Sequence, residues 1–138
     1  MSRALVLDSE ALAALVGPAS ARQREVRAAL GAAVRLRRDA IVPAVVLAEL
    51  YRGRGRSSLI DACLSRETGL LVRATDRALA RLVGGILAGA GAGSDLIVDA
   101  HVVAAAVEAG GGLLLTRDSA DLKRLAAPYR NVQVVDIG

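Results

Sequence analysis

The chain has 138 residues, 54% of them hydrophobic, and a formal net charge of +4 with a pI of about 10.2. This length suits a single domain that buries roughly two-thirds of its unfolded surface. No apolar run approaches the roughly 18 residues that a membrane-spanning helix needs, and Asp8 cuts short the apolar start before a signal peptide could form. We therefore expect a cytoplasmic protein with no membrane anchor. Cys63 is the only cysteine, which excludes an internal disulfide.

The positive charge comes almost entirely from arginine, because Lys123 is the only lysine. A basic surface attracts phosphate-rich polymers through counterion release. A composition rich in Arg, Ala and Gly is also typical of a GC-rich coding sequence, so the charge alone leaves nucleic-acid binding open. Tyr51 and Tyr129 are the only aromatic residues, too few for a platform that stacks several single-stranded bases.

Hydrophobic periodicity and turn residues predict alternating strands and helices. In chain order, we predict a strand over 4–7, helices over 9–16 and 21–36, a strand over 40–42, helices over 44–51 and from 57 or 58 to 65, a strand over 70–72, a helix capped by Thr75 that runs to about 88, a helix capped by Ser94 that carries Asp99, a strand over 113–115, a helix over 118–126 and a strand over 132–135. Gly84 and Gly85, inside one of these helices, predict close helix packing or a break. The alternation predicts an α/β fold whose parallel sheet is covered by helices on both faces.

Four acidic residues stand out by their positions. Asp8 and Asp118 directly follow predicted strands, and Glu49 and Asp99 lie on otherwise apolar helices. Asp8 and Asp118 could instead cap helices, while Glu49 and Asp99 could reach solvent or pair with an arginine. Ligands of such sheets bind beyond the carboxyl ends of the strands. Each alternative can explain a single acid, but they explain all four together less well. Four separate segments place acids at one edge of the sheet, and these segments offer no matching basic residues.

Carboxylates that gather in one place repel one another unless a divalent cation neutralises them. Oxygen ligands without a cluster of His or Cys favour Mg²⁺ or Mn²⁺ over zinc. Such a cation can orient and acidify a water for attack on a phosphodiester, and it neutralises the charge that grows on the phosphate and on the leaving oxygen. The four acids therefore predict a cation site suited to phosphodiester hydrolysis.

The motifs that carry these acids resemble those of the PIN-domain ribonucleases, particularly the VapC toxins of bacterial toxin–antitoxin pairs. They are VLDS at 6–9, VVLAELYRG at 45–53, IVDAHVVAAAVEAGG at 97–111 and LLLTRDSADL at 113–122. Each motif alone is weakly specific, but the ordered set spans almost the entire chain. The resemblance implies a single PIN domain over 1–138, built as a Rossmann-like three-layer α/β/α sandwich with a five-stranded parallel sheet of order 3-2-1-4-5. It also implies Mg²⁺- or Mn²⁺-dependent endoribonuclease activity, a small cognate antitoxin that blocks the site, and a homodimer.

The resemblance also assigns roles to individual residues. The family's four acids, which would bind the metal and serve catalysis, fall on Asp8, Glu49, Asp99 and Asp118. Thr116 stands in the T-x-D position and would steady a neighbouring carboxylate or a water on the metal, and Ser9 would act similarly. Leu122 stands where relatives often carry an aromatic residue, which bears on the choice of substrate more than on catalysis.

Two further acids compete for a place in the site. Asp95 lies one helical turn before Asp99 on the same face, but beside Ser94 it is better explained as a first-turn acid that the helix dipole favours. Asp121 is either a supporting acid or a surface residue. His101 lies on a different helix face from Asp99, so we interpret it as structural.

The remaining candidates have equally good structural explanations. Arg52, Arg54 and Arg56 lie in a loop after Glu49 and could contact an RNA backbone, or the loop could simply be solvated. Cys63 fits a small core residue, since no base accompanies it. The glycines at 110–112 precede a strand and do not open a helix, so they match no phosphate-binding motif.

The leading prediction is a metal-dependent endoribonuclease toxin. The nearest alternative is a PIN nuclease that processes RNA outside a toxin–antitoxin pair, and another is a non-catalytic PIN-like module that binds RNA or protein through its basic loops. A phospho-acceptor receiver domain is disfavoured. Its third strand should end in an acceptor Asp, whereas here the third strand leads to Arg73 and Ala74.

Overall fold

A five-stranded parallel sheet organises the computed structural model, which describes residues 3–138 apart from the side chain of Arg54. The strands are β1 (Ala4–Leu7), β2 (Ala40–Pro43), β3 (Leu70–Arg73), β4 (Gly112–Thr116) and β5 (Val132–Asp136). Their order is β3-β2-β1-β4-β5, and every neighbouring pair is parallel. The predicted fold class and strand order are confirmed, and each predicted strand is present to within one residue at either end.

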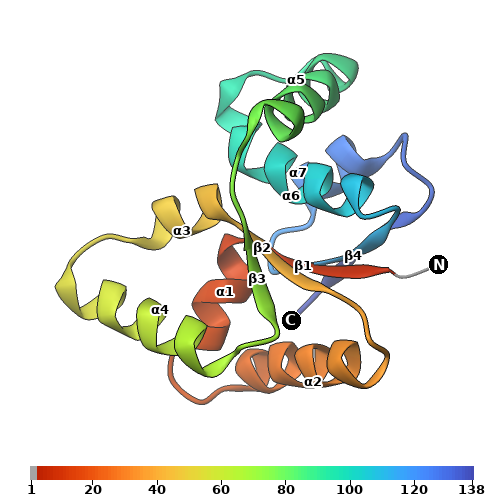
Figure 1. Cartoon of the computed structure of the whole chain (residues 1–138). Coiled ribbons are helices and arrows are strands. Elements are labelled where there is room, and N and C mark those ends of the chain that lie inside the picture. The colour runs from red at the N-terminus through yellow and green to blue at the C-terminus, as the bar shows by residue number, and fades with distance from the viewer. Residues whose placement is uncertain (1–2) are drawn as a thin grey trace.

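Helices cover both faces of this sheet (Figure 1). They are α1 (Ser9–Val16), α2 (Ala21–Arg35), α3 (Ala44–Leu50), α4 (Arg54–Arg66), α5 (Arg77–Ala90), the 3-10 turn η1 (Ser94–Leu96), α6 (Ile97–Glu108) and α7 (Ala120–Ala126). One layer contains α6 and α7 with α5 packed on them, and the other contains α1 and α2 with α4 beside α1. Within residues 3–138, none of these helices combines the length and the apolar character needed to cross a membrane.

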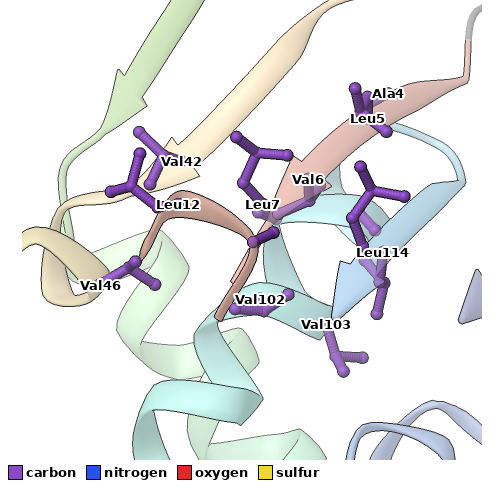
Figure 2. Close-up of a cluster of buried hydrophobic side chains, with 14 of the residues drawn as sticks. Ala4, Leu5, Val6, Leu7, Leu12, Val42, Val46, Val102, Val103 and Leu114 are labelled. Atoms are coloured by element: carbon purple, nitrogen blue, oxygen red, sulfur yellow. The ribbon is translucent and has the colours of Figure 1, made fainter. Parts of the chain in front are cut away.

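The central strand β1 is buried on both faces, as expected for the middle of a parallel sheet. Figure 2 shows its side chains among Val42 of β2, Leu114 of β4 and Val102 of α6. Helix α6 is buried over seven consecutive residues, 100–106, so the protein surrounds it on all sides. The apolar sequence of this helix is therefore explained by its central position, and only its ends reach the edges of the sheet.

Two predicted helix caps were wrong. Asp76, and not Thr75, caps α5, because its carboxylate accepts a hydrogen bond of 2.9 Å from the backbone N–H of Leu79. Ser94 opens the 3-10 turn before α6 and does not cap the helix itself. Thr, Ser and Asp are all favoured caps, so a sequence that offers several in a row does not show which one the chain uses.

The expectation for Gly84 and Gly85 was also wrong. Helix α5 continues through both residues, and a Cβ added at either position would meet nothing within 4 Å. Both glycines are exposed on the outer face of the helix. They therefore mark neither a break nor a close contact within the described part of the chain.

The run of three glycines before β4 has a steric explanation. Gly110 and Gly111 have φ angles of +84° and +129°, which side chains other than glycine rarely adopt. A Cβ on Gly112 would lie 2.5 Å from the carbonyl oxygen of Ala4 on the neighbouring strand. The glycines thus allow a sharp passage from α6 into the sheet and a close approach of β4 to β1.

Replacing Gly112 by Ala is expected to lower the free energy of unfolding by about 1–3 kcal/mol, because the new methyl group must push β4 away from β1. Chemical denaturation with circular dichroism measures this change. Gly84→Ala is the matched control, and it should stabilise the protein by roughly 0.5–1 kcal/mol, since it adds helix propensity in open space. Equal effects of the two substitutions would contradict this account of the close strand approach.

Candidate functional site

A cavity of about 160 Å³ at the carboxyl edge of the sheet is lined almost entirely by polar residues. Its lining consists of Asp8, Ser9, Glu10, Glu49, Asp95, Val98, Asp99 and Asp118. The structure thus brings together all four acids that the sequence singled out, from the junction of β1 and α1, from α3, from α6 and from the turn after β4. Among the side chains that the structure describes, no arginine or lysine lines this cavity, so they do not balance its acidic charge. A larger hollow of about 390 Å³ between α7 and β5 contains no acid.

Asp8 has two roles at the junction of β1 and α1. Its side chain caps α1 by accepting a hydrogen bond of 2.8 Å from the backbone N–H of Ala11, and the same side chain lines the acidic cavity. The residue is only 4% exposed, and this burial raises the pKa of Asp8 to about 6. The hydroxyl of Thr116 and the amide of Ala11 partly oppose the rise in pKa. Asp8 can therefore cap α1 and line the acidic cavity at the same time.

Asp99 lies in the first turn of α6, where the buried helix reaches the edge of the sheet. Its pKa is raised to about 6, first by burial and then by the negative charges of Asp8, Asp121, Glu49 and Asp118. The charges of four other acids thus act on Asp99. Its position at a helix N-terminus favours the carboxylate, but it does not cancel the repulsion.

Glu49 and Asp118 form the exposed rim of the cavity. Asp118 precedes α7, which begins at Ala120 and not at Asp118 as predicted. The buried hydroxyl of Thr116 stabilises the turn that joins Asp118 to β4. Its Oγ1 accepts a hydrogen bond of 3.0 Å from the N–H of Asp118 and lies 3.0 Å from the carbonyl oxygen of the same residue. Thr116 therefore fixes the backbone that presents Asp118.

Ser9 contributes a hydroxyl that has no partner among the described residues. Its Oγ is buried, makes no hydrogen bond, and belongs to a residue that lines the acidic cavity. A buried polar atom without a partner is uncommon in folded proteins and calls for a ligand or water. Hard oxygen atoms from carboxylates and a hydroxyl are the donors that Mg²⁺ and Mn²⁺ prefer.

The acidic side chains do not form a ready-made metal cage. Among residues 3–138, no three His, Cys, Asp or Glu side chains converge closely enough to hold an ion. Carboxylates without a neutralising charge repel one another, and this repulsion adds to burial in raising the pKa of Asp99. The donor set thus suits a divalent cation in its chemistry, and binding one requires these side chains to draw together.

Two acids that were not predicted to belong to the site line the cavity. Glu10 was not singled out, and Asp95 was interpreted as a first-turn acid outside the site, yet both line the cavity. Each indeed lies in the first turn of a helix, the usual place for an acid that stabilises the helix dipole. Asp121 does not line the cavity, although its charge acts on Asp99.

His101 and Cys63 take structural places. His101 is buried in α6, and its Nδ1 lies 2.7 Å from the carbonyl oxygen of Ile97. Cys63 is buried in the core, and this burial raises the pKa of its thiol, which opposes a role as a nucleophile. Neither residue lines the acidic cavity.

The arginine-rich segment after Glu49 is only partly a loop. Helix α4 begins at Arg54, directly after Gly53 with its φ of +100°, and not at Ser57 or Ser58 as predicted. Arg52 donates a hydrogen bond of 2.9 Å from Nε to the carbonyl oxygen of Glu49, and Arg56 is exposed. The side chain of Arg54 lies outside the described part of the structure. Neither Arg52 nor Arg56 lines the acidic cavity.

Comparisons with known proteins identify the fold and the family. VapBC2 from Rickettsia felis, solved with a fragment of promoter DNA, aligns with a TM-score of 0.65 and 18% identity over 96% of this chain and 98% of that chain. FitAcB from Neisseria gonorrhoeae gives 0.63 and 16% over 96% and 97%, and DNA-bound VapBC from Salmonella typhimurium gives 0.63 and 15% over the whole of both chains. At such identities the likeness shows a shared fold. No curated protein matches the chain. Residues 5–128 match the PIN domain, and a match over so much of the sequence shows that the chain belongs to the PIN domain family.

Proposed function

We propose that this protein is an Mg²⁺- or Mn²⁺-dependent endoribonuclease that acts as the toxin of a toxin–antitoxin pair. The observation that carries the proposal is the acidic cavity, in which acids from four separate segments meet with no basic residue among the described side chains of the lining. Burying and crowding carboxylates destabilises a protein. A protein that retains such a cluster at the ligand-binding edge of its sheet therefore gains from what the cluster binds.

The residues fit a divalent cation through two deep carboxylates and two rim carboxylates. Asp8 and Asp99 are the buried or half-buried members, and Glu49 and Asp118 are exposed at the rim. Ser9 adds a hydroxyl oxygen. When bound, the cation supplies neutralisation of the phosphate charge and acidification of a water. We assign the deep pair to holding the cation and the rim pair to orienting water and substrate.

Thr116 and the cap of α1 keep these side chains in place. Thr116 fixes the turn that carries Asp118, and the hydrogen bond from Ala11 fixes Asp8. A bound cation also strengthens RNA binding over the acidic cavity, because acids at this edge repel a phosphate. Metal and substrate binding are therefore coupled in this proposal.

The toxin assignment rests on a different observation from the nuclease assignment. Two of the solved structures with this fold are VapBC assemblies. By that likeness we propose a small antitoxin protein as partner, a homodimer, and a cytoplasmic location. A PIN nuclease that processes RNA on its own is the alternative, and the presence or absence of a small reading frame immediately upstream of the gene separates the two.

Cleavage of a labelled single-stranded RNA is expected to require Mg²⁺ or Mn²⁺, to stop on addition of EDTA, and to return when excess cation is added. Gel analysis of the products measures this directly. Titration calorimetry should also detect saturable binding of Mn²⁺ in the absence of RNA. Cleavage that persists in EDTA would overturn the metal-dependent mechanism. Absence of both cleavage and Mn²⁺ binding would favour a non-catalytic module.

A further inference from the structure

A second cavity, of about 280 Å³, lies next to the acidic one and is lined by two arginines and one acid. The end of α1, the start of α2 and Arg117 of the turn after β4 form its walls. Glu10 lines both cavities, and Arg117 is followed directly by Asp118 of the acidic cavity. The two cavities are therefore neighbours along one surface. We call the second one the Arg22–Arg117 cavity, after its two basic lining residues.

Arg22 is held in this cavity without an acidic partner. Its Nε is buried and makes no hydrogen bond with the described residues, and a Cβ on Gly138 would lie 3.4 Å from that Nε. No salt bridge within residues 3–138 involves Arg22 or Arg117. A partly buried guanidinium group that lacks an acceptor is costly unless an anion or water satisfies it.

The start of α2 strengthens the positive potential of the cavity. The N-terminus of a helix carries partial positive charge and favours acids in its first turn. The first turn of α2 has no acid, and Arg22, which lines the cavity, lies in this turn. Cations at this end of a helix are unfavourable for the protein alone. An anion bound there would be stabilised by the helix dipole and by arginine together.

The corner between α1 and α2 is fixed before any ligand arrives. Gln23 donates from Nε2 to the carbonyl oxygens of Leu15 at 3.1 Å and Gly17 at 2.7 Å. Ser20 caps α2 by accepting a hydrogen bond of 3.1 Å from the N–H of Gln23. The backbone that carries Arg22 is thus held by three hydrogen bonds, which reduces the entropy lost on binding an anion.

We propose that the Arg22–Arg117 cavity binds a backbone phosphate of a single-stranded polynucleotide, next to the phosphate that lies over the acidic cavity. That the strand is RNA rests on the proposed function, whereas the phosphate chemistry rests on the cavity itself. Arginine forms strong, directional hydrogen bonds with phosphate oxygens. Since the acidic cavity repels the substrate, a basic neighbour supplies the attraction that positions the strand.

The test measures RNA binding in EDTA, where cleavage does not occur, by fluorescence anisotropy of a labelled single strand at several salt concentrations. Arg22→Ala and Arg117→Ala should each weaken binding by roughly 3–10-fold and reduce the salt dependence of log Kd by about 0.7, the value for one phosphate contact on a single strand. Arg24→Ala is the matched control, because Arg24 occupies the same helical turn, is exposed, and does not line the cavity. It should leave the salt dependence unchanged.

The outcomes separate this proposal from the nuclease proposal. If both cavity variants bind RNA like the unaltered protein while metal-dependent cleavage persists, the phosphate subsite is wrong and the nuclease stands. If the variants lose binding but no cleavage occurs under any condition, the subsite stands and the nuclease is wrong. Variants that lose affinity only for inorganic phosphate, or only for an oligoglutamate peptide, would also overturn a polynucleotide site. Arg22→Lys should retain part of the affinity, and circular dichroism checks the folding of every variant.

Discussion

Asp99→Asn is expected to reduce metal-dependent RNA cleavage by about 10²–10³-fold or more while leaving the protein folded. Asparagine keeps the shape of the side chain and removes the charge on which the fields of Asp8, Glu49, Asp118 and Asp121 converge. The loss of one carboxylate weakens cation binding and so weakens neutralisation of the phosphate. Single-turnover cleavage at increasing Mn²⁺ measures both the rate and the cation requirement.

A set of matched substitutions gives this prediction its control. Asp136→Asn changes the same residue type at the same edge of the sheet, but Asp136 is exposed at the end of β5 and does not line the cavity. It should leave cleavage within about 2-fold of the unaltered rate, as expected for a surface change away from the chemistry. An equal loss in Asp136→Asn and Asp99→Asn, or full activity in both, would remove the cavity from the mechanism.

The same cleavage assay applies to the other acids that line the cavity. Glu49→Gln and Asp118→Asn should lower the cleavage rate, because both line the cavity at its exposed side. Glu10 and Asp95 line it as well, and their Gln and Asn variants decide whether they assist catalysis or serve only the helix dipole. If those two variants cleave RNA at the unaltered rate, Glu10 and Asp95 do not contribute to catalysis. The assignment of Asp99 does not depend on this result.

The placement of the acids followed from topology more than from local sequence. Strand order and parallel direction bring the residue after each strand to one edge, so Asp8 and Asp118 were predictable once the alternation of strands and helices was recognised. Asp99 was predictable because a carboxylate on a helix as apolar as α6 needs a special environment. Hydrophobic periodicity predicted the alternating strands and helices and the parallel sheet, whereas the strand order was implied by the resemblance to the PIN-domain ribonucleases.

What could not be predicted depends on the direction of side chains in short turns. Glu10 and Asp95 carry the ordinary pattern of first-turn acids, and the pattern is the same whether the side chain faces solvent or the cavity. The Arg22–Arg117 cavity joins residues 95 positions apart, which no local pattern reveals. The exposed Gly84 and Gly85 show the reverse case, in which a conspicuous pattern has no contact behind it.

In the metal-free protein, the stability contributed by Asp8 and Asp99 is expected to fall as pH rises from about 4 to about 7. Both carboxyl groups have a folded pKa of about 6, above the ordinary value of 3.8, so the folded state binds more protons than the unfolded state in this range. Their contribution is therefore fully present below about pH 4 and is lost as pH rises through about 6. For the buried Asp8 the loss is on the order of 2–3 kcal/mol, and for the half-buried Asp99 it is smaller because solvent screens its charge.

Asp99→Asn tests this contribution without acid denaturation of the rest of the protein. At pH 7 and in EDTA the variant should melt at the same temperature as the unaltered protein or higher, because it removes a repelled charge from the cavity. At pH 4, where Asp99 is mostly protonated in the folded state, the difference should disappear. A variant that melts much lower at pH 7 would instead indicate that Asp99 serves as a structural partner of another group.

Adding Mn²⁺ at pH 7 should reverse the order of the two melting temperatures, so that the unaltered protein melts higher than Asp99→Asn. A cation that binds only the folded state raises its stability by about 2.7 kcal/mol when present at 100 times its dissociation constant. The unaltered protein has the full set of carboxylates and should gain this stability, whereas Asp99→Asn should gain much less. Repulsion without the cation and stabilisation with it are two consequences of the same cluster, so both must appear in the unaltered protein. If Mn²⁺ stabilises the two proteins equally, the ion binds elsewhere, and the acidic cavity is not the metal site.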